Sequence, residues 1–168
     1  MTGLTGLLRS RRVHVAAACV LQAALVVAAV APQLSARLTG RDYRLAVAPL
    51  DPVDPFRGAY VALGYPGLPA LQADQRPLPS GAVFLPLERV PGGELWEGAA
   101  LTVRQPAEGP FLRCASEGWR ARCGIESLFA SQDEARRMER QLVNGAVAVV
   151  RIDDRGNAAL LRVESAGP

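Results

Sequence analysis

The sequence predicts an α+β protein in which one N-terminal transmembrane helix precedes a β-rich domain of about seven strands. We expect the sheet to curl into a small barrel, with one helix near the C-terminus. Three observations lead to this prediction: a long apolar run near the N-terminus, period-two alternation in much of the remaining chain, and one late capped segment of helical character. At 168 residues the chain is long enough for one domain with a hydrophobic core besides the apolar segment.

The apolar run covers residues 13–31 and is interrupted only by His14 and Gln22. Its length is close to the roughly 20 residues that a helix needs to cross a bilayer. An Arg-Ser-Arg-Arg sequence beginning at Arg9 precedes it, and this positive flank predicts a cytoplasmic N-terminus. We therefore expect a cytoplasmic basic segment over 1–12, a transmembrane anchor over 13–31, a connector over 32–40 and an extracytoplasmic domain over 41–168.

A cleaved signal peptide is the alternative interpretation, because Ala29-Val30-Ala31 resembles a small-residue cleavage site. Two features favour an uncleaved anchor. The apolar run is longer than the roughly 7–15 residues of a signal-peptide core, and Pro32 would follow the cut. We expect a single-pass protein of the inner (cytoplasmic) membrane whose C-terminal domain is periplasmic or extracellular.

The stretch from Asp51 to Tyr65 combines two Asp-Pro pairs, an Arg-Gly pair and two tyrosines. Asp54 suits the N-cap of a short turn, and from Tyr60 the period changes to two, which predicts a strand over 59–65. We predict that Arg57 donates a charge-assisted hydrogen bond to a nearby carboxylate and holds the loop in shape. The candidate acceptors are Asp51, Asp54 and Glu126. The alternative is that the same charges form a ligand site.

The other elements follow from alternation, turn residues and capping signals. Pro86 within a predicted strand indicates an edge position, because proline cannot donate to a β-ladder. Ser131 and Glu134 have the spacing of a capping box and predict a helix over 132–143. The proline-rich residues 66–80 predict a surface loop. Further strands are predicted over 41–48, 82–88, 95–104, 111–115, 119–125, 146–152 and 157–164.

Charge and residue usage exclude several kinds of chemistry from the outer domain. All nineteen basic residues are arginine, and three of them precede the apolar run, which leaves sixteen against sixteen acidic residues. A neutral domain lacks the basic surface that nucleic acid requires. The absence of lysine excludes Schiff-base catalysis. The only histidine, His14, lies in the apolar run, so histidine-dependent nucleophiles and histidine-ligated metals are excluded as well. We expect no cofactor and no metal.

Carboxylates are the remaining candidates for catalysis. Asp51 with Asp54, or either of them with Glu126, would form an acid–base pair of the kind that glycosidases use if they came together. The run from Asp153 to Asn157 superficially resembles a calcium loop, but it lacks the alternating oxygen ligands and the terminal glutamate. A hairpin turn is the better interpretation of that run, and no residue is assigned a catalytic role.

The three cysteines divide by position. Cys19 lies within the anchor, where we expect it to pack as a small apolar residue. Cys114 and Cys123 lie on the two arms of one predicted hairpin, and a pair in an oxidising compartment is a disulfide candidate. A turn centred on Gly118-Trp119 places the two cysteines opposite each other, whereas a turn centred on Glu117 does not.

Two motifs resemble those of the GDYXXLXY family of membrane-anchored bacterial proteins. Nine residues match its first signature, in which Ala59 replaces the family's aspartate. The stretch from Gly124 to Phe129 is similar to the second family motif. The resemblance implies a multi-pass membrane protein as a partner, because relatives are often encoded beside such proteins. The nine matching residues are Asp51, Pro52, Phe56, Arg57, Gly58, Tyr60, Val61, Leu63 and Tyr65.

We therefore predict a membrane-anchored binding or scaffold protein of the bacterial envelope, without catalysis of its own. The alternative, from a different functional class, is a carboxylate-dependent hydrolase that acts on envelope glycans. The residues expected to bind a ligand or partner are Asp51, Asp54, Arg57, Tyr60, Tyr65 and Glu126.

Overall fold

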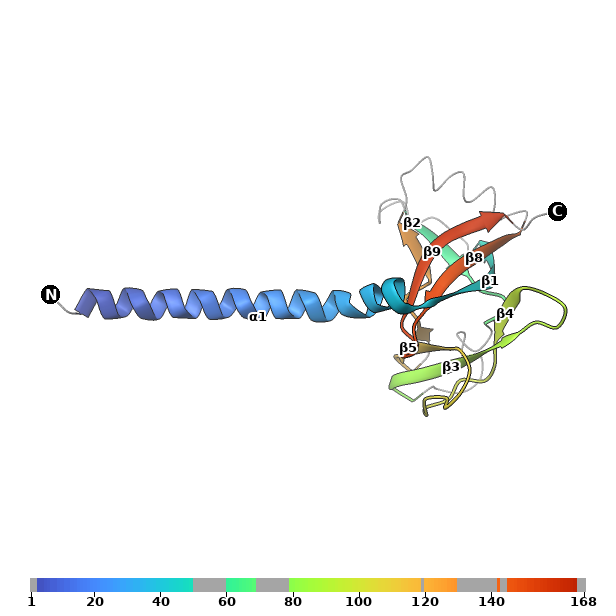
Figure 1. Ribbon diagram of the computed structural model, residues 1–168, viewed down its shortest axis with the longest axis horizontal. Coiled ribbons are helices and arrows are strands. Elements are labelled where there is room, and N and C mark those ends of the chain that lie inside the picture. Colours follow the sequence, from blue (N-terminus) through green and yellow to red (C-terminus); the bar gives the residue numbers. More distant parts are fainter. Residues whose placement is uncertain are drawn as a thin grey trace.

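A long helix projects from a β-domain in the computed structural model (Figure 1). The structure describes residues 3–49, 60–68, 79–118, 120–129, 142 and 145–165. The helix, α1 (Gly3–Thr39), has 37 residues and passes through Pro32 without ending. Residues 32–39, expected as part of a connector, are therefore the last turns of the same helix.

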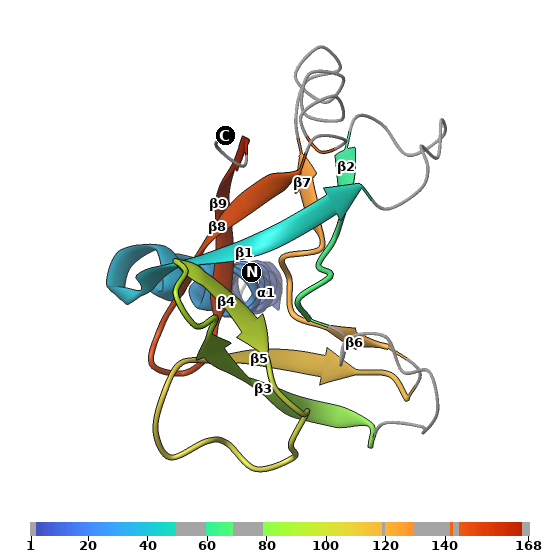
Figure 2. The ribbon, with the colours of Figure 1, turned by 90° about the vertical axis from the view of Figure 1, so that its right-hand side faces the viewer.

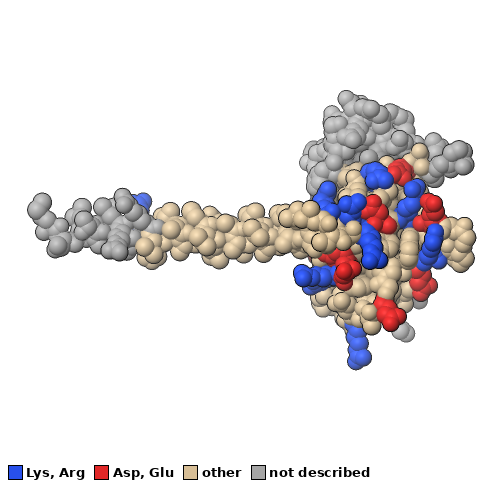
Figure 3. Space-filling model, in the orientation of Figure 1, with Lys and Arg blue, Asp and Glu red and all other residues tan. Residues whose placement is uncertain are grey.

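The apolar part of α1 has the properties of a membrane anchor or a signal sequence. The stretch Val13–Thr39 has a mean hydropathy of 2.3 in its most apolar part, and none of that part is buried against the domain. No charged residue occurs between Arg12 and Arg37. Figure 3 shows this uncharged stretch beside a domain whose visible face carries charges of both signs.

Nine strands among the described residues form one curled, mixed sheet (Figure 2). It makes a half-barrel rather than the closed small barrel that we expected. The strand order is β6-β5-β3-β4-β1-β2-β7, and the β8-β9 hairpin joins the sheet through β1. The strands are β1 (Arg41–Pro49), β2 (Tyr60–Gly64), β3 (Gly81–Arg89), β4 (Leu95–Gly98), β5 (Phe111–Ser116), β6 (Ala121–Arg122), β7 (Ser127–Phe129), β8 (Ala146–Ile152) and β9 (Ala158–Ser165).

Strand β1 continues the chain directly from α1 and pairs with three other strands. It runs antiparallel to β8 from Arg41 to Val47 and parallel to β4 at Arg44 and Leu45. Its last residues pair with β2. The contacts that hold the start of β1 therefore also set the position of the domain relative to α1.

The core is built from alternate residues of strands on opposite parts of the curled sheet. In β3 the buried residues are Val83, Leu85 and Leu87, and their neighbours are more exposed, as expected for a strand with one face in the core. Strand β8 is buried at six of its seven positions, which explains its nearly continuous apolar sequence. Side chains that are at most 1% exposed include Leu45, Leu85, Leu112, Ile125 and Val150.

The edge position predicted from Pro86 is wrong. Strand β3 pairs with β5 from Gly81 to Pro86 and with β4 from Leu87 to Arg89, so it has neighbours on both sides. Proline is tolerated there because Pro86 lies just beyond the β3-β4 ladder. Its carbonyl accepts a hydrogen bond from Ala99 N at 2.9 Å, and the missing N–H falls where that ladder has already stopped.

Two predicted strands are shorter than expected, and one strand was not predicted. The 95–104 strand ends at Gly98, after which Thr102 forms only an isolated bridge. The 119–125 strand is reduced to β6, because Gly124 at φ 81° turns the chain toward β7. The three residues of β7 are too few for their alternation to be recognised.

The predicted helix over 132–143 lies outside the described residues, apart from Leu142, which is buried in the core. Leu142 itself is helical, and α1 is the only helix whose bounds fall within the described part of the chain. The predicted final hairpin is confirmed to within one residue at each end by β8 and β9.

Candidate functional site

The last turns of α1 are attached to the turn between β8 and β9. Ser35 Oγ donates a hydrogen bond of 2.5 Å to Asp153 Oδ2, and the neighbouring Ala36 is completely buried. Gly40 follows the helix where there is no room for a side chain. A Cβ at that position would lie 2.5 Å from Ala36 O and 2.8 Å from the carbonyl carbon of Ile152. The helix end and the hairpin are therefore packed backbone against backbone.

Asp153 organises the hairpin side of this junction. Its carboxylate is buried with the residue only 6% exposed, and it accepts backbone hydrogen bonds of 2.9 Å from Arg155 N and Asn157 N. Asn157 Nδ2 donates a further bond of 2.8 Å. Burial alone would raise the pKa of Asp153, but the hydrogen bonds from Ser35, Asn157 and the backbone outweigh it and lower the pKa. The segment is thus a hairpin turn whose own donors occupy the carboxylate, as the sequence indicated.

Arg151 joins β8 to β1 and to the end of the helix. Its Nε and Nη2 donate hydrogen bonds of 2.6 and 3.1 Å to the two carboxylate oxygens of Asp42. Its Nη1 donates to the carbonyl oxygen of Arg37 at 3.1 Å, which satisfies a backbone acceptor in the last turn of α1. The hydrogen bond from Arg151 lowers the pKa of Asp42.

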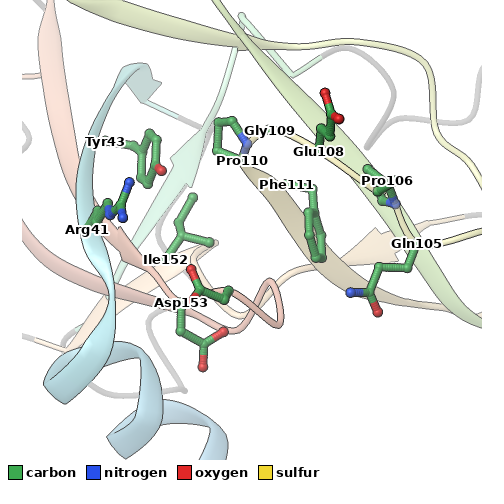
Figure 4. Close-up of a pocket in the computed structure, with 12 residues that line it drawn as sticks. Arg41, Tyr43, Gln105, Pro106, Glu108, Gly109, Pro110, Phe111, Ile152 and Asp153 are labelled. Atoms are coloured by element: carbon green, nitrogen blue, oxygen red, sulfur yellow. The ribbon is translucent and has the colours of Figure 1, made fainter.

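A pocket of about 350 Å³ lies beside this junction (Figure 4). Arg41 and Tyr43 of β1 line one wall, and the loop that carries Glu108 lines the opposite wall together with Phe111, the first residue of β5. Asp153 lies next to the end of α1 in the same view. The complete lining is Arg41, Tyr43, Gln105, Pro106, Ala107, Glu108, Gly109, Pro110, Phe111, Ile152, Asp153 and Asp154.

Charged side chains in the pocket differ from those next to it in whether they already have a bonding partner. Arg151 and Asp42 are joined in an ion pair, and the bonding capacity of Asp153 is taken up by Ser35 and the hairpin. Within the described ranges, no ion pair involves Arg41, Glu108 or Asp154, and all three are exposed. The lining of the pocket therefore includes one guanidinium and two carboxylates that are in none of these ion pairs.

The two segments that carry the family resemblance lie side by side. Strands β2 and β7 pair antiparallel, with Tyr60 opposite Phe129 and Ala62 opposite Ser127. Beyond this ladder Leu63 N donates to Glu126 O at 2.9 Å. The two motifs, separated in the sequence, thus form one structural unit at an end of the strand order.

The described members of the predicted site are held within this unit. Tyr65 is 7% exposed, and its hydroxyl donates a hydrogen bond of 2.7 Å to Ile125 O. Burial, with a smaller contribution from the charge of Glu126, raises the pKa of Tyr65, so the hydroxyl remains a donor. Glu126 accepts hydrogen bonds from Cys123 N and from Gly124 N, the latter at 3.0 Å. Glu126 is thus bonded to the backbone of the turn that precedes it.

The remaining members of the predicted site are not brought together in the described structure. Asp51, Asp54 and Arg57 lie outside the described residues, so the predicted hydrogen bond of Arg57 stays a prediction. Tyr60 is placed by its backbone in β2. Neither Tyr65 nor Glu126 lines the pocket.

The predicted disulfide is present between Cys114 and Cys123. In the β5-β6 ladder Ala115 pairs with Arg122 and Ser116 with Ala121, which is the register that places the two cysteines opposite each other. Their Cα atoms are 4.1 Å apart, and both residues are buried. Cys19 is a free, exposed cysteine on α1. A disulfide of this kind indicates an extracytoplasmic domain.

Sequence reasoning did not find the pocket, because its lining comes from three segments far apart in the chain. These are the start of β1, the loop over 105–110 and the hairpin turn at 152–154. The position of Arg41 immediately after the apolar helix was the one available signal. No motif linked it to the carboxylates at 108 and 154 on the other segments.

Comparison with known proteins places the chain in a family. No curated protein and no solved structure matches it. The GDYXXLXY protein family matches residues 22–163, which extend from the middle of α1 through the sheet to β9 and include the paired motif strands β2 and β7. The match covers most of the chain, so this protein belongs to the GDYXXLXY family.

Proposed function

We propose that this chain is a membrane-anchored, extracytoplasmic binding or scaffold protein of the bacterial envelope, without catalysis of its own. The observation that carries the proposal is the attachment of α1 to the β8-β9 turn through Ser35 and Asp153. Because Ala36 is buried and Gly40 leaves no space, the domain has a fixed orientation relative to the helix. An anchored scaffold needs this property to present the same surfaces to the membrane and to a partner.

Two further features support an anchored domain outside the cytoplasm. The helix is unbroken across residues 29–32, the region of the alternative cleavage site. The Cys114–Cys123 disulfide is the kind of bond that persists in oxidising compartments. The arginines before the apolar run give the helix an N-in orientation, which puts the domain on the oxidising side.

A multi-pass membrane protein is the partner that we propose. Gln22 is exposed near the middle of the apolar helix, where its amide would face hydrocarbon if α1 were alone in the bilayer. Amide side chains in membrane helices are stabilised by hydrogen bonds to a neighbouring helix. A partner with spanning helices supplies such a neighbour.

The described residues give the hydrolase alternative no support. Both carboxylate oxygens of Glu126 accept hydrogen bonds from backbone N–H groups of the adjacent turn. This arrangement is that of a carboxylate that holds a turn in shape.

Photo-crosslinking in intact membranes tests the partner. A photo-reactive residue replaces Ala18, which lies on the helical face of Gln22, and the control replaces Ala24, which lies on the opposite face. We expect capture of a multi-pass membrane protein from position 18 and much less from position 24, and Gln22→Ala should lower the yield at position 18. Equal capture from both faces would overturn the proposed partner. Recovery of a soluble mature chain beginning near Pro32 would overturn the anchor.

A further inference from the structure

The length of α1 sets the height of the pocket above the bilayer, given the anchorage proposed above. A helix rises about 1.5 Å per residue, so about 20 residues from Val13 cross a hydrocarbon core of about 30 Å and reach Pro32. Arg37 then lies among the headgroups. The helix ends at Thr39, about 10 Å beyond the hydrocarbon, and β1 begins at Arg41. The base of the domain therefore lies next to the headgroup layer of the outer leaflet.

The pocket lies at this base. Ile152, Asp153 and Asp154 line it, and Asp153 is bonded to Ser35 of the helix. Arg41 is the second residue after α1 ends. Figure 4 shows Asp153 near the blue ribbon of the helix end and Arg41 on the strand that continues from it. A lipid headgroup can therefore reach the pocket without leaving its leaflet.

The charges of the pocket match a molecule that carries both signs. A guanidinium binds phosphate oxygens through paired donors, and Arg41 supplies one from the β1 wall. A primary ammonium has three donors, and carboxylates are its natural acceptors. Asp154 supplies a carboxylate from the β8-β9 turn, whereas the carboxylate of Glu108 belongs to the lining but points away from Arg41 and Asp153 (Figure 4). In the part of the chain that the structure describes, these three charges are in no ion pair that ligand binding would have to break.

The aromatic residues of the pocket are held in place before any ligand binds. Tyr43 packs edge-to-face on Trp96 with ring centroids 5.1 Å apart, and Phe111 packs on Phe84 at 5.8 Å. Gly156 fixes the hairpin against Phe111, since a Cβ at that position would lie 2.5 Å from Phe111 Cε2. A pocket of about 350 Å³ is at the small end of ligand sites, which suits a headgroup and excludes acyl chains.

We propose that this pocket binds the phosphoethanolamine headgroup of an outer-leaflet phospholipid, with the phosphate on Arg41 and the ammonium on Asp154. Choline is a poor fit, because its quaternary ammonium has no N–H donor for the carboxylate. An anionic headgroup is also a poor fit, because the same carboxylate repels it. The site thus distinguishes phosphatidylethanolamine from lipids with either of these headgroups.

Native mass spectrometry of the detergent-solubilised full chain tests this proposal. Phosphatidylethanolamine, phosphatidylcholine and phosphatidylglycerol with identical acyl chains are titrated separately, and free O-phosphoethanolamine serves as the soluble probe. We expect phosphatidylethanolamine to bind about tenfold more tightly than the other two lipids, as loss of one charge-assisted contact would predict. Equal binding of the three lipids would overturn the proposal. Tighter binding of phosphatidylglycerol, or of the soluble probe, would overturn it too.

Variants locate the binding in the pocket. Arg41→Gln should weaken the binding of phosphatidylethanolamine by about tenfold, and Asp154→Asn should reduce it to the level of phosphatidylcholine. Arg120→Gln and Glu88→Gln are the matched controls, since both residues are exposed and lie outside the pocket, and they should bind like the parent. Unchanged binding by Arg41→Gln would contradict the assignment. Intact disulfide and parental melting show that a variant is folded. The binding measurement does not depend on membrane topology. Absence of lipid binding would therefore leave the proposed anchor and partner unaffected, and failure of the anchor or partner proposal would leave the lipid-binding result unaffected.

Discussion

Ser35 and Asp153, separated by 118 positions in the sequence, are joined by a hydrogen bond that links the end of α1 to the tip of the β8-β9 hairpin. Among the residues of α1 whose burial is described, the bond lies where the helix touches the domain core, since Ala36 is fully buried beside it and the preceding apolar residues are exposed. This contact makes the helix part of the domain's structure instead of a tether. The first three predictions follow from it.

Ser35→Ala should lower the free energy of unfolding by about 1.5–3 kcal/mol, because a hydrogen bond to a buried carboxylate is lost. Chemical denaturation of the full chain followed by circular dichroism measures the change. Thr39→Ala is the matched control, since the Thr39 hydroxyl bonds only the exposed carbonyl of Ser35, and we expect a much smaller effect. Equal losses in the two variants would contradict a special role for the contact with Asp153.

Stability should fall in acid as Asp153 is protonated. Its pKa is lowered in the folded protein, so its stabilising contribution is fully present above the unfolded value of about 3.9. The contribution is lost as the pH falls through the lower folded value. Asp42, whose pKa is also lowered, acts in the same direction. Melting temperatures measured from neutral pH down to strongly acidic pH should show the fall.

Asp153→Asn is the variant that isolates this effect. It should be less stable than the parent at neutral pH and should lose less additional stability in acid. Asp154→Asn, in the same turn but without these hydrogen bonds, should follow the parental pH profile. A parental profile in Asp153→Asn would show that other groups cause the acid loss.

Gly40→Ala should destabilise the junction by about 1–3 kcal/mol, because the new methyl group meets backbone atoms that cannot move aside. The distances of 2.5 Å to Ala36 O and 2.8 Å to the Ile152 carbonyl carbon are both too short for a carbon atom. Gly93→Ala is the control, since its added Cβ would have no atom closer than 3.8 Å. Urea denaturation of both variants makes the comparison. A neutral effect at position 40 would mean that helix and hairpin separate readily.

Removing the disulfide should lower the free energy of unfolding by about 2–3 kcal/mol, according to the loop-closure entropy of a short ring. The Cys114→Ala, Cys123→Ala double variant and the reduced parent should melt alike, and both below the oxidised parent. Cys19→Ser is the control, because this residue is a free cysteine on α1. Free thiols at positions 114 and 123 in protein taken from the envelope, found by alkylation and mass spectrometry, would refute the bond.

Tyr65→Phe should lower the free energy of unfolding by about 1 kcal/mol, because the buried carbonyl of Ile125 loses its donor. The two family motifs meet at this bond, so the change should loosen β7 more than the β8-β9 hairpin. Amide hydrogen exchange followed by mass spectrometry resolves the two regions. Tyr43→Phe, at the half-buried tyrosine of the pocket, should leave exchange in β7 unchanged. Uniformly faster exchange in Tyr65→Phe would contradict a local role.

Local signals were sufficient for several elements of this protein. The apolar run after Arg9 predicted the helix, and alternation with a turn between the arms predicted the β8-β9 hairpin, whose strands lie close together in the chain. The cysteines on the two arms of a predicted hairpin made Cys114 and Cys123 a disulfide candidate, and the structure supplied the register that joins them. For the helix and the β8-β9 hairpin, the residues that determine the structure are neighbours in the sequence, so their spacing already contains the geometry.

Only the tertiary structure decided which distant segments meet. The sequence did not predict that α1 extends beyond Pro32 and docks on Asp153, or that Pro86 lies in a strand with two neighbours. It likewise did not predict that β2 pairs with β7, or that Arg41 faces the loop around Glu108. Period and turn chemistry specify the conformation of a segment and the face it buries. The choice of partner depends on how all the apolar faces are covered at once, which is a property of the folded chain.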